Sequence, residues 1–383
     1  MPISVINIFP CKGKENSENI ADDGFEIDMK YFLWCLKFTG LHQRCWSGTK
    51  ERLLFRRLSN IYRGFVPVLL IFNFIFSLGE FINVKGFDGA LLNSLISSIW
   101  FMQVALFSLN NAIRAWRWQR FYKRWNEYEN EYKTDSKRFN RKLSILVVIC
   151  YIFWVLIAAA FMGVGMSSPR PPSGFILYVP EELVLPITIF IIVAYFFFIS
   201  TWFLLTSQFA IICITICRLL QELYKTIKSY FENPEKFSED IESFRQRHDK
   251  ICVMILRADD ILSTFIMTTV ASTIPIIVLT LYFVIFVTDG VHTFSYAATW
   301  WSISLSTLQL TVVFLLGGAV NFMLNVFLNR LTSQPIGLTA CGLFVLDKPT
   351  IVTFVGSIAT YAIVMIQFKP GEGSYNVVCN CTV

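Results

Sequence analysis

The sequence predicts an all-α membrane protein with seven transmembrane helices, and three observations support this fold class. Of its 383 residues, 55% are hydrophobic and only 16% are charged, which is far from the composition of a soluble globular protein. Apolar stretches near the roughly 20 residues that a spanning helix needs recur along the chain. Lysine and arginine gather in alternate gaps between these stretches. The chain is therefore expected to cross a bilayer repeatedly.

A transmembrane helix is expected at each of seven apolar stretches. They are 61–82, 90–112, 143–166, 183–213, 262–288, 297–326 and 350–368. The opening residues, "MPISVINIFP", carry no basic segment of the kind that begins a secretory signal peptide. The first spanning helix is therefore expected only after a polar N-terminal segment.

The distribution of basic residues predicts the orientation. Of the 33 lysine and arginine residues, all but Lys85, Arg170 and Lys369 fall on one side of the predicted membrane. The side richer in these residues is normally cytosolic. The N-terminus is thus expected in the cytosol and the C-terminus outside, opposite to a G-protein-coupled receptor. The net charge of +6 follows from this topology and needs no nucleic-acid partner.

Two of the helices are expected to continue far below the membrane. Between Leu183 and Tyr230 the chain has no glycine and a single proline, Pro186. A continuous helix of that length measures on the order of 70 Å, against about 30 Å of hydrocarbon. The expected organisation is a cytosolic segment at 1–60, six transmembrane helices within 61–326 with cytosolic extensions at 113–142 and 214–261, a short cytosolic helix at 327–349, a last membrane helix at 350–368 and an extracellular tail at 369–383.

Side-chain periodicity predicts how the extensions pack. A heptad-like seam leads into the fifth spanning helix, and an aromatic face follows the second. The seam is Ile241, Phe244, His248, Ile251, Ile255 and Leu262, and the aromatic face is Trp118, Tyr122, Trp125, Tyr128 and Tyr132. Both predict a packed cytosolic helix bundle. Pro275 and the pair Gly317-Gly318 are expected to be kinks or points of close helix packing.

Several chemistries are absent from the sequence. It contains no phosphate-binding or dinucleotide-binding glycine loop and no serine-nucleophile elbow, and its histidines, His42, His248 and His292, lie far apart. An enzyme, a cofactor and a metal site are not expected. The predicted spans are also nearly free of charge, with only Glu80 and Glu182 near outer ends, which argues against a proton-coupled pump or a voltage sensor. A receptor, a channel or a neutral-solute carrier remains.

The last apolar stretch carries the most specific motif. It reads Thr360-Tyr361, five apolar residues, then Gln367-Phe368. This pattern resembles the C-terminal signature of insect gustatory receptors, and it lies in the last span, where that family has it. The preceding segment "GLTACGLFVLDKPTIVTFVGSIATY" also looks like that family. "FRQRHDKICVMILRADDILSTFIM" is similar to the sugar-sensing subgroup.

The resemblance implies a tastant-gated, non-selective cation channel in the plasma membrane of sensory neurons. Members of that family are tetramers, so a homotetramer or a heterotetramer with related subunits is expected, with cations, membrane lipid and a small-molecule tastant as partners. The subgroup similarity favours sugars, and a bitter compound or another tastant or odorant is the alternative ligand. In such a channel the last helix of each subunit lines a central pore, and the ligand binds within the subunit's own bundle.

The pore is predicted from the last helix. Thr360 and Gln367 lie seven positions apart and so share a helix face. Four copies of Gln367 would form an amide ring, which apolar neighbours close by dewetting. The predicted pore and gate residues are Thr360, Tyr361, Ile363, Val364, Gln367 and Phe368, with Glu372 at the outer mouth. The alternative is that Thr360 bonds its own helix backbone and Gln367 a neighbouring helix.

A sugar site needs aromatic faces for stacking and polar groups for hydrogen bonds. The outer-half candidates are Glu80, Trp100, Glu182, Tyr195, Trp300 and Trp301, with Asp289 and His292 in an outer loop. The alternative role of Trp300 and Trp301 is anchoring at the membrane interface. Two other classes of protein remain open: a G-protein-coupled receptor, which the charge distribution opposes, and a neutral-solute transporter, for which no inverted internal repeat is visible.

Overall fold

The computed structural model describes residues 29–41, 53–83, 89–132, 136–166, 181–232, 241–286, 293–328 and 338–367. Throughout these ranges the chain is helical apart from short turns and the loop at 338–347, and its one β-type pairing is an isolated bridge between Thr339 and Val345. The helices are α2 (Lys30–Phe38), α3 (Leu53–Asn83), α4 (Gly89–Ile113), α5 (Ala115–Tyr132), α6 (Ser136–Met166), α7 (Glu181–Glu232), α8 (Ile241–Phe286), α9 (Thr293–Leu328) and α10 (Lys348–Gln367).

The predicted fold class is confirmed. Among the described residues, six helices are long and apolar enough to cross a membrane, and α3 contains a shorter apolar segment, Gly64–Gly79. Together they coincide with the seven predicted spans. Which end of the chain faces the cytosol stays a prediction.

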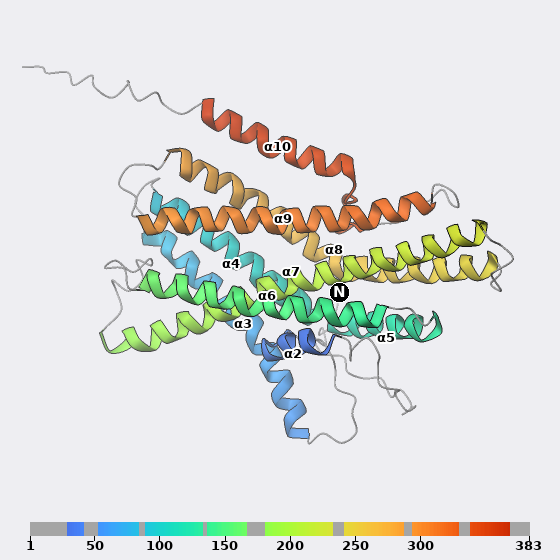
Figure 1. The fold of residues 1–383 in the computed structure, drawn as a ribbon. Helices are drawn as coiled ribbons and strands as arrows, with labels where there is room; N and C mark the ends of the chain where they lie inside the picture. The colour runs from blue at the N-terminus through green and yellow to red at the C-terminus, as the bar shows by residue number, and fades with distance from the viewer. Residues whose placement is uncertain are drawn as a thin grey trace, which may run out of the picture.

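The two longest helices form the base of the molecule. α7 has 52 residues and α8 has 46, as their uninterrupted sequences predict. Figure 1 shows their joined ends running together past the rest of the bundle, beside α5. We call this end, formed by α5, the C-terminal half of α7 and the N-terminal half of α8, the base.

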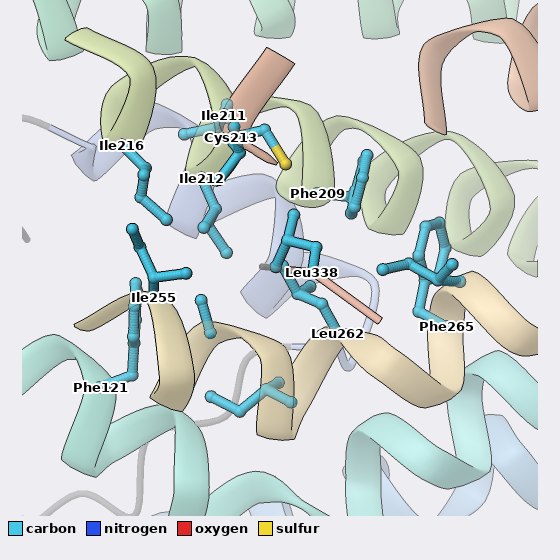
Figure 2. Close-up of a cluster of buried hydrophobic side chains, with 14 of the residues drawn as sticks. Phe121, Phe209, Ile211, Ile212, Cys213, Ile216, Ile255, Leu262, Phe265 and Leu338 are labelled. Atoms are coloured by element: carbon cyan, nitrogen blue, oxygen red, sulfur yellow. The ribbon is translucent and has the colours of Figure 1, made fainter. Parts of the chain in front are cut away.

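The core of the base is built from the predicted periodic faces. Phe244, His248, Ile251, Ile255 and Leu262 of the seam are all buried. On α5, Trp118, Trp125 and Tyr128 are buried, and Tyr122 and Tyr132 pack against the same cluster. Figure 2 shows this cluster, with side chains from α5, α7 and α8 meeting around Leu338. The helix-period patterns therefore gave the correct buried faces.

A short helix was predicted within 327–349, and it stays a prediction for 329–337, which lie outside the described residues. α9 extends to Leu328, and the described part, 338–347, is a loop closed by the Thr339–Val345 bridge. At its tip Cys341 and Gly342 adopt left-handed backbone angles, with φ of 52° and 75°. Such angles are incompatible with a right-handed helix, so the chain reverses here instead of coiling.

The glycine pair on α9 is a point of close packing, as predicted. An added Cβ at Gly317 would lie 2.5 Å from Leu346 Cδ1, and one at Gly318 would lie 3.1 Å from Ile351 Cδ1. Leu346 lies near the end of the loop and Ile351 in the first turn of α10, so the two glycines let the chain approach α9 closely where the last helix begins.

Candidate functional site

The last helix, α10, is the most exposed apolar element of the described chain. None of its 20 residues is buried, although its composition suits a membrane span. Figure 1 shows it along the outside of the bundle, with its C-terminal end splayed away from α9. Large apolar side chains such as Val352, Tyr361 and Ile366 are 58–70% exposed. A helix of this kind needs lipid or another copy of the chain around it.

One face of α10 is a polar stripe. It consists of Thr353, Ser357, Thr360, Val364 and Gln367, which recur at spacings of four and three and fall within an arc of about 80°. All five are exposed. Four of the five carry hydroxyl or amide groups. The stripe is therefore a polar track along an otherwise apolar helix.

The opposite face of α10 turns toward its own subunit. Ile351, Phe354 and Ile358 are partly buried and pack against the main core. The ring of Phe354 stacks on Phe314 of α9 at 5.6 Å and contacts Phe344 of the loop at 5.2 Å. The polar stripe thus points away from the bundle to which α10 belongs.

The structure describes most of the predicted pore residues, all of them on α10. Thr360 donates its hydroxyl hydrogen to the Gly356 carbonyl at 2.8 Å, as the alternative prediction had it, and Thr353 and Ser357 make the same kind of bond one turn back. Such bonding leaves the hydroxyl oxygens on the exposed face. Tyr361 and Ile363 flank the stripe. Phe368 and Glu372 lie outside the described residues.

Three of the candidate ligand residues lie together inside the bundle, and a fourth, Trp300, is exposed. Trp100, Tyr195 and Trp301 join one aromatic cluster between α3, α4, α6, α7 and α9. Within it Trp301 stacks on Trp154 at 5.2 Å, nearly parallel. Trp300 is 48% exposed, which suits an interface anchor.

The remaining ligand candidates cannot be placed by their side chains. Glu80 and Glu182 belong to α3 and α7, but their side chains are outside the described set, as are Asp289 and His292 altogether. Their role in ligand binding stays a prediction.

A buried amide network lies beside the aromatic cluster. Gln103 donates to the Gln309 side-chain oxygen at 3.1 Å, and the indole N–H of Trp202 donates to the same oxygen at 2.9 Å. The Gln309 amide nitrogen donates to the Thr206 hydroxyl at 3.3 Å. Both glutamines are at most 1% exposed, so the network fixes α4, α7 and α9 to one another inside the bundle.

Several buried polar atoms have no hydrogen-bond partner in the described part of the chain, and three of them lie on a residue of the network, on a residue of the aromatic cluster or directly beside Trp301 in the sequence. These three are Oε1 of Gln103, Nε1 of Trp154 and Oγ of Ser302. An unsatisfied buried polar atom costs about 1–3 kcal/mol, so such atoms are usually satisfied by water or a ligand. None of these three atoms was predicted from the sequence as part of a site. A glutamine within an apolar span indicates a polar site, and that pattern led to the prediction for Gln367. The same pattern holds at Gln103.

Metal chemistry has no support within the described ranges. No group of three or more His, Cys, Asp or Glu side chains in them is placed to hold a metal ion. The polar groups of the amide network and of the polar stripe are neutral hydroxyl, amide and indole groups.

Comparison with known proteins identifies the family. The sequence model of the seven-transmembrane chemosensory receptors matches residues 29–325 and 319–372, which is most of the chain. The chain belongs to this family. Chemosensory receptors are not enzymes, and family membership favours a receptor over a solute carrier. The resemblance to insect chemoreceptors found in the last span is thereby confirmed, while the sugar subgroup is not.

Solved structures with the same fold include an insect olfactory receptor. The olfactory receptor OR5 from Machilis hrabei, solved alone and in complex with eugenol, aligns in each case with a TM-score of 0.68 at 16% identity. Each alignment covers 90% of this chain and 100% of that one. A search of curated proteins gives no match. This chemosensory receptor is thus a multi-pass membrane protein with the OR5 fold.

Proposed function

We propose that this chemosensory receptor is a subunit of a tastant-gated, non-selective cation channel in the plasma membrane of sensory neurons, working as a homotetramer or with related subunits. The observation that carries the proposal is the polar stripe on α10, which faces away from its own bundle while no residue of the helix is buried.

Physical chemistry favours a pore at this stripe. Hydroxyl and amide groups in hydrocarbon need water or a polar partner. Copies arranged around an axis meet both needs, because the stripe then faces a water-filled path while the apolar flank of α10 faces lipid or the next copy. Val364 lies within the stripe and is the apolar side chain best placed to narrow such a path by dewetting.

The aromatic cluster is the proposed ligand site. Its ring faces suit stacking on the apolar face of a sugar, and the three unpartnered polar atoms offer both donor and acceptor groups for hydroxyls. Sugars are therefore the first ligand class to test. Bitter compounds and eugenol belong in the same panel, because OR5 was solved with eugenol.

Heterologous expression with patch recording tests the proposal. Ligand-evoked cation current without added G protein is the expected result. Gln367→Ala should alter single-channel conductance or ion selectivity at unchanged surface amount, whereas Ile366→Ala, on the apolar flank and 60% exposed, should leave both intact. Unchanged conductance and selectivity in Q367A would show that the Gln367 side chain does not line the pore. Absence of current across the whole panel would contradict the channel itself.

A further inference from the structure

The loop that leads into α10 is hydrogen-bonded to one asparagine of α9 at both of its ends. Asn321 of α9 is 1% exposed, and its side chain contacts both ends of the loop. Its amide oxygen accepts from the Leu338 N–H at 2.8 Å, and its amide nitrogen donates to the Leu346 carbonyl at 2.6 Å. Leu346 N–H also donates to the Leu338 carbonyl at 3.1 Å. A single side chain thus closes the loop and fixes it to α9.

A second helix holds the same loop. The carboxylate of Asp259 in α8 accepts hydrogen bonds from the backbone N–H and the hydroxyl of Thr339. The loop is therefore bonded to α8 and α9 at once. Relative movement of these two helices has to move the loop or break these bonds.

Apolar packing reinforces the attachment. Leu338 and Leu346 are both fully buried, and Figure 2 shows Leu338 among the side chains of α7 and α8. Leu346 fits against Gly317, where no larger residue has space. These contacts make 338–346 a rigid part of the base.

The helix beyond the loop is held far less firmly. Asp347 begins α10 by accepting a hydrogen bond from the Thr350 N–H at 2.9 Å, but no residue of the helix is buried. Its contacts with the main core are made by Ile351, Phe354 and Ile358, between the first turn and the middle of the helix. The direction in which the rest of α10 extends is therefore set mainly where the loop is fastened.

α9 also reaches the proposed ligand site. Gln309, in the amide network, precedes Asn321 by twelve residues on the same helix, or about 18 Å. A shift of α9 at the aromatic cluster is carried along a continuous helix to the loop. α9 thus connects the proposed ligand site with the loop ahead of the last helix.

We propose that Asn321 is a positioning residue that couples movement of α9 to the position of α10, and so sets the balance between closed and open channel. This inference rests on the proposed channel function. Asn321 touches neither ligand nor ion path, and it acts through its two-sided bond to the loop.

The test replaces Asn321 by aspartate, which keeps one acceptor oxygen but puts a second oxygen against the Leu346 and Leu338 carbonyls. At matched surface amount, we expect Asn321→Asp to shift the half-activating ligand concentration about tenfold or more, or to produce current without ligand. Asn325→Asp is the matched control, because Asn325 is an exposed asparagine one turn further along α9, and it should stay within about twofold of the unmodified receptor. A merely structural residue would change the surface amount and leave the concentration dependence alone.

Thr339→Val provides a second route if N321D fails to reach the surface. It removes the hydroxyl bonded to Asp259 and keeps the backbone N–H bond, so a smaller shift in the same direction is expected. Unchanged activation in N321D, or in T339V where N321D is not expressed, would overturn the proposal.

A measurement that needs no ligand separates this inference from the channel proposal. A cysteine introduced by Gln367→Cys is labelled with a water-soluble thiol reagent, with and without Asn321→Asp. A changed labelling rate supports control of α10 by the loop even if no current is ever evoked. An unchanged rate at normal surface amount contradicts it.

Discussion

Replacing Gly317 by alanine tests how closely α9 packs against the loop ahead of α10. The new Cβ would lie 2.5 Å from Leu346 Cδ1 and 3.4 Å from Leu346 Cβ. Leu346 is fully buried, so its side chain has little room to move away. Overpacking of this kind costs about 1–3 kcal/mol, while the change from glycine to alanine in a helix returns up to about 1 kcal/mol. With a return of about 1 kcal/mol, a net loss of up to about 2 kcal/mol in the free energy of unfolding is expected.

Gly356→Ala on α10 is the matched control, because nothing lies within 4 Å of its added Cβ. It should be neutral or stabilising by up to about 1 kcal/mol. Thermal unfolding of the detergent-solubilised receptor should place the midpoint of G317A below that of the unmodified protein and that of G356A at or above it. The unfolding midpoint of Gly317→Val should be lower still than that of G317A. A G317A midpoint equal to or above the unmodified protein would refute the close packing of α9 and loop.

Other consequences are measurable on the same protein. Leu338→Ala removes a fully buried side chain from the base and should lower the free energy of unfolding by about 2–5 kcal/mol, seen as a lower unfolding midpoint. Trp154→Phe keeps an aromatic ring but removes the unpartnered indole N–H, so it should weaken activation by a ligand that accepts a hydrogen bond there while surface amount holds. Neutralising Glu372 should reduce inward current at low salt, since four carboxylates at a pore mouth concentrate cations, and an unchanged current would make it a solvated tail residue. Hydrogen bonds from Thr350 hold the pKa of Asp347 below its ordinary value, so its capping of α10 is present above that value and is lost only as pH falls through the lowered pKa. The loss of stability in Asp347→Ala, about 1 kcal/mol, should therefore be the same at pH 7 and pH 5.

The long helices and their buried faces were predictable because periodicity is a local property of the sequence. The seam from Phe244 to Leu262 and the aromatic face of α5 repeat at helical spacing, and that spacing alone says which side is buried. The glycine pair on α9 was predictable for a similar reason, since adjacent glycines in an apolar helix permit close approach.

Features that depend on contacts between distant segments were not predictable. Gln103 and Gln309 are 206 positions apart, and no local pattern says that they share a hydrogen bond. The reversal of the chain at 338–347 was not predicted, because its tip places Cys341, which is not glycine, in a left-handed conformation. The polar stripe was only half recognised, because the family motif begins at Thr360 while the same spacing continues back through Ser357 and Thr353.

The exposure of α10 separates the proposed pore-lining segment from the rest of the folded subunit. Since none of its residues is buried, substitutions along its stripe cost the subunit little folding free energy, and the bundle can change its aromatic cluster without repacking the last helix. In the proposed channel, ion selectivity and ligand specificity can then diverge independently. A chimaera that exchanges 348–367 between relatives should keep the ligand range of one parent and the ion permeation of the other.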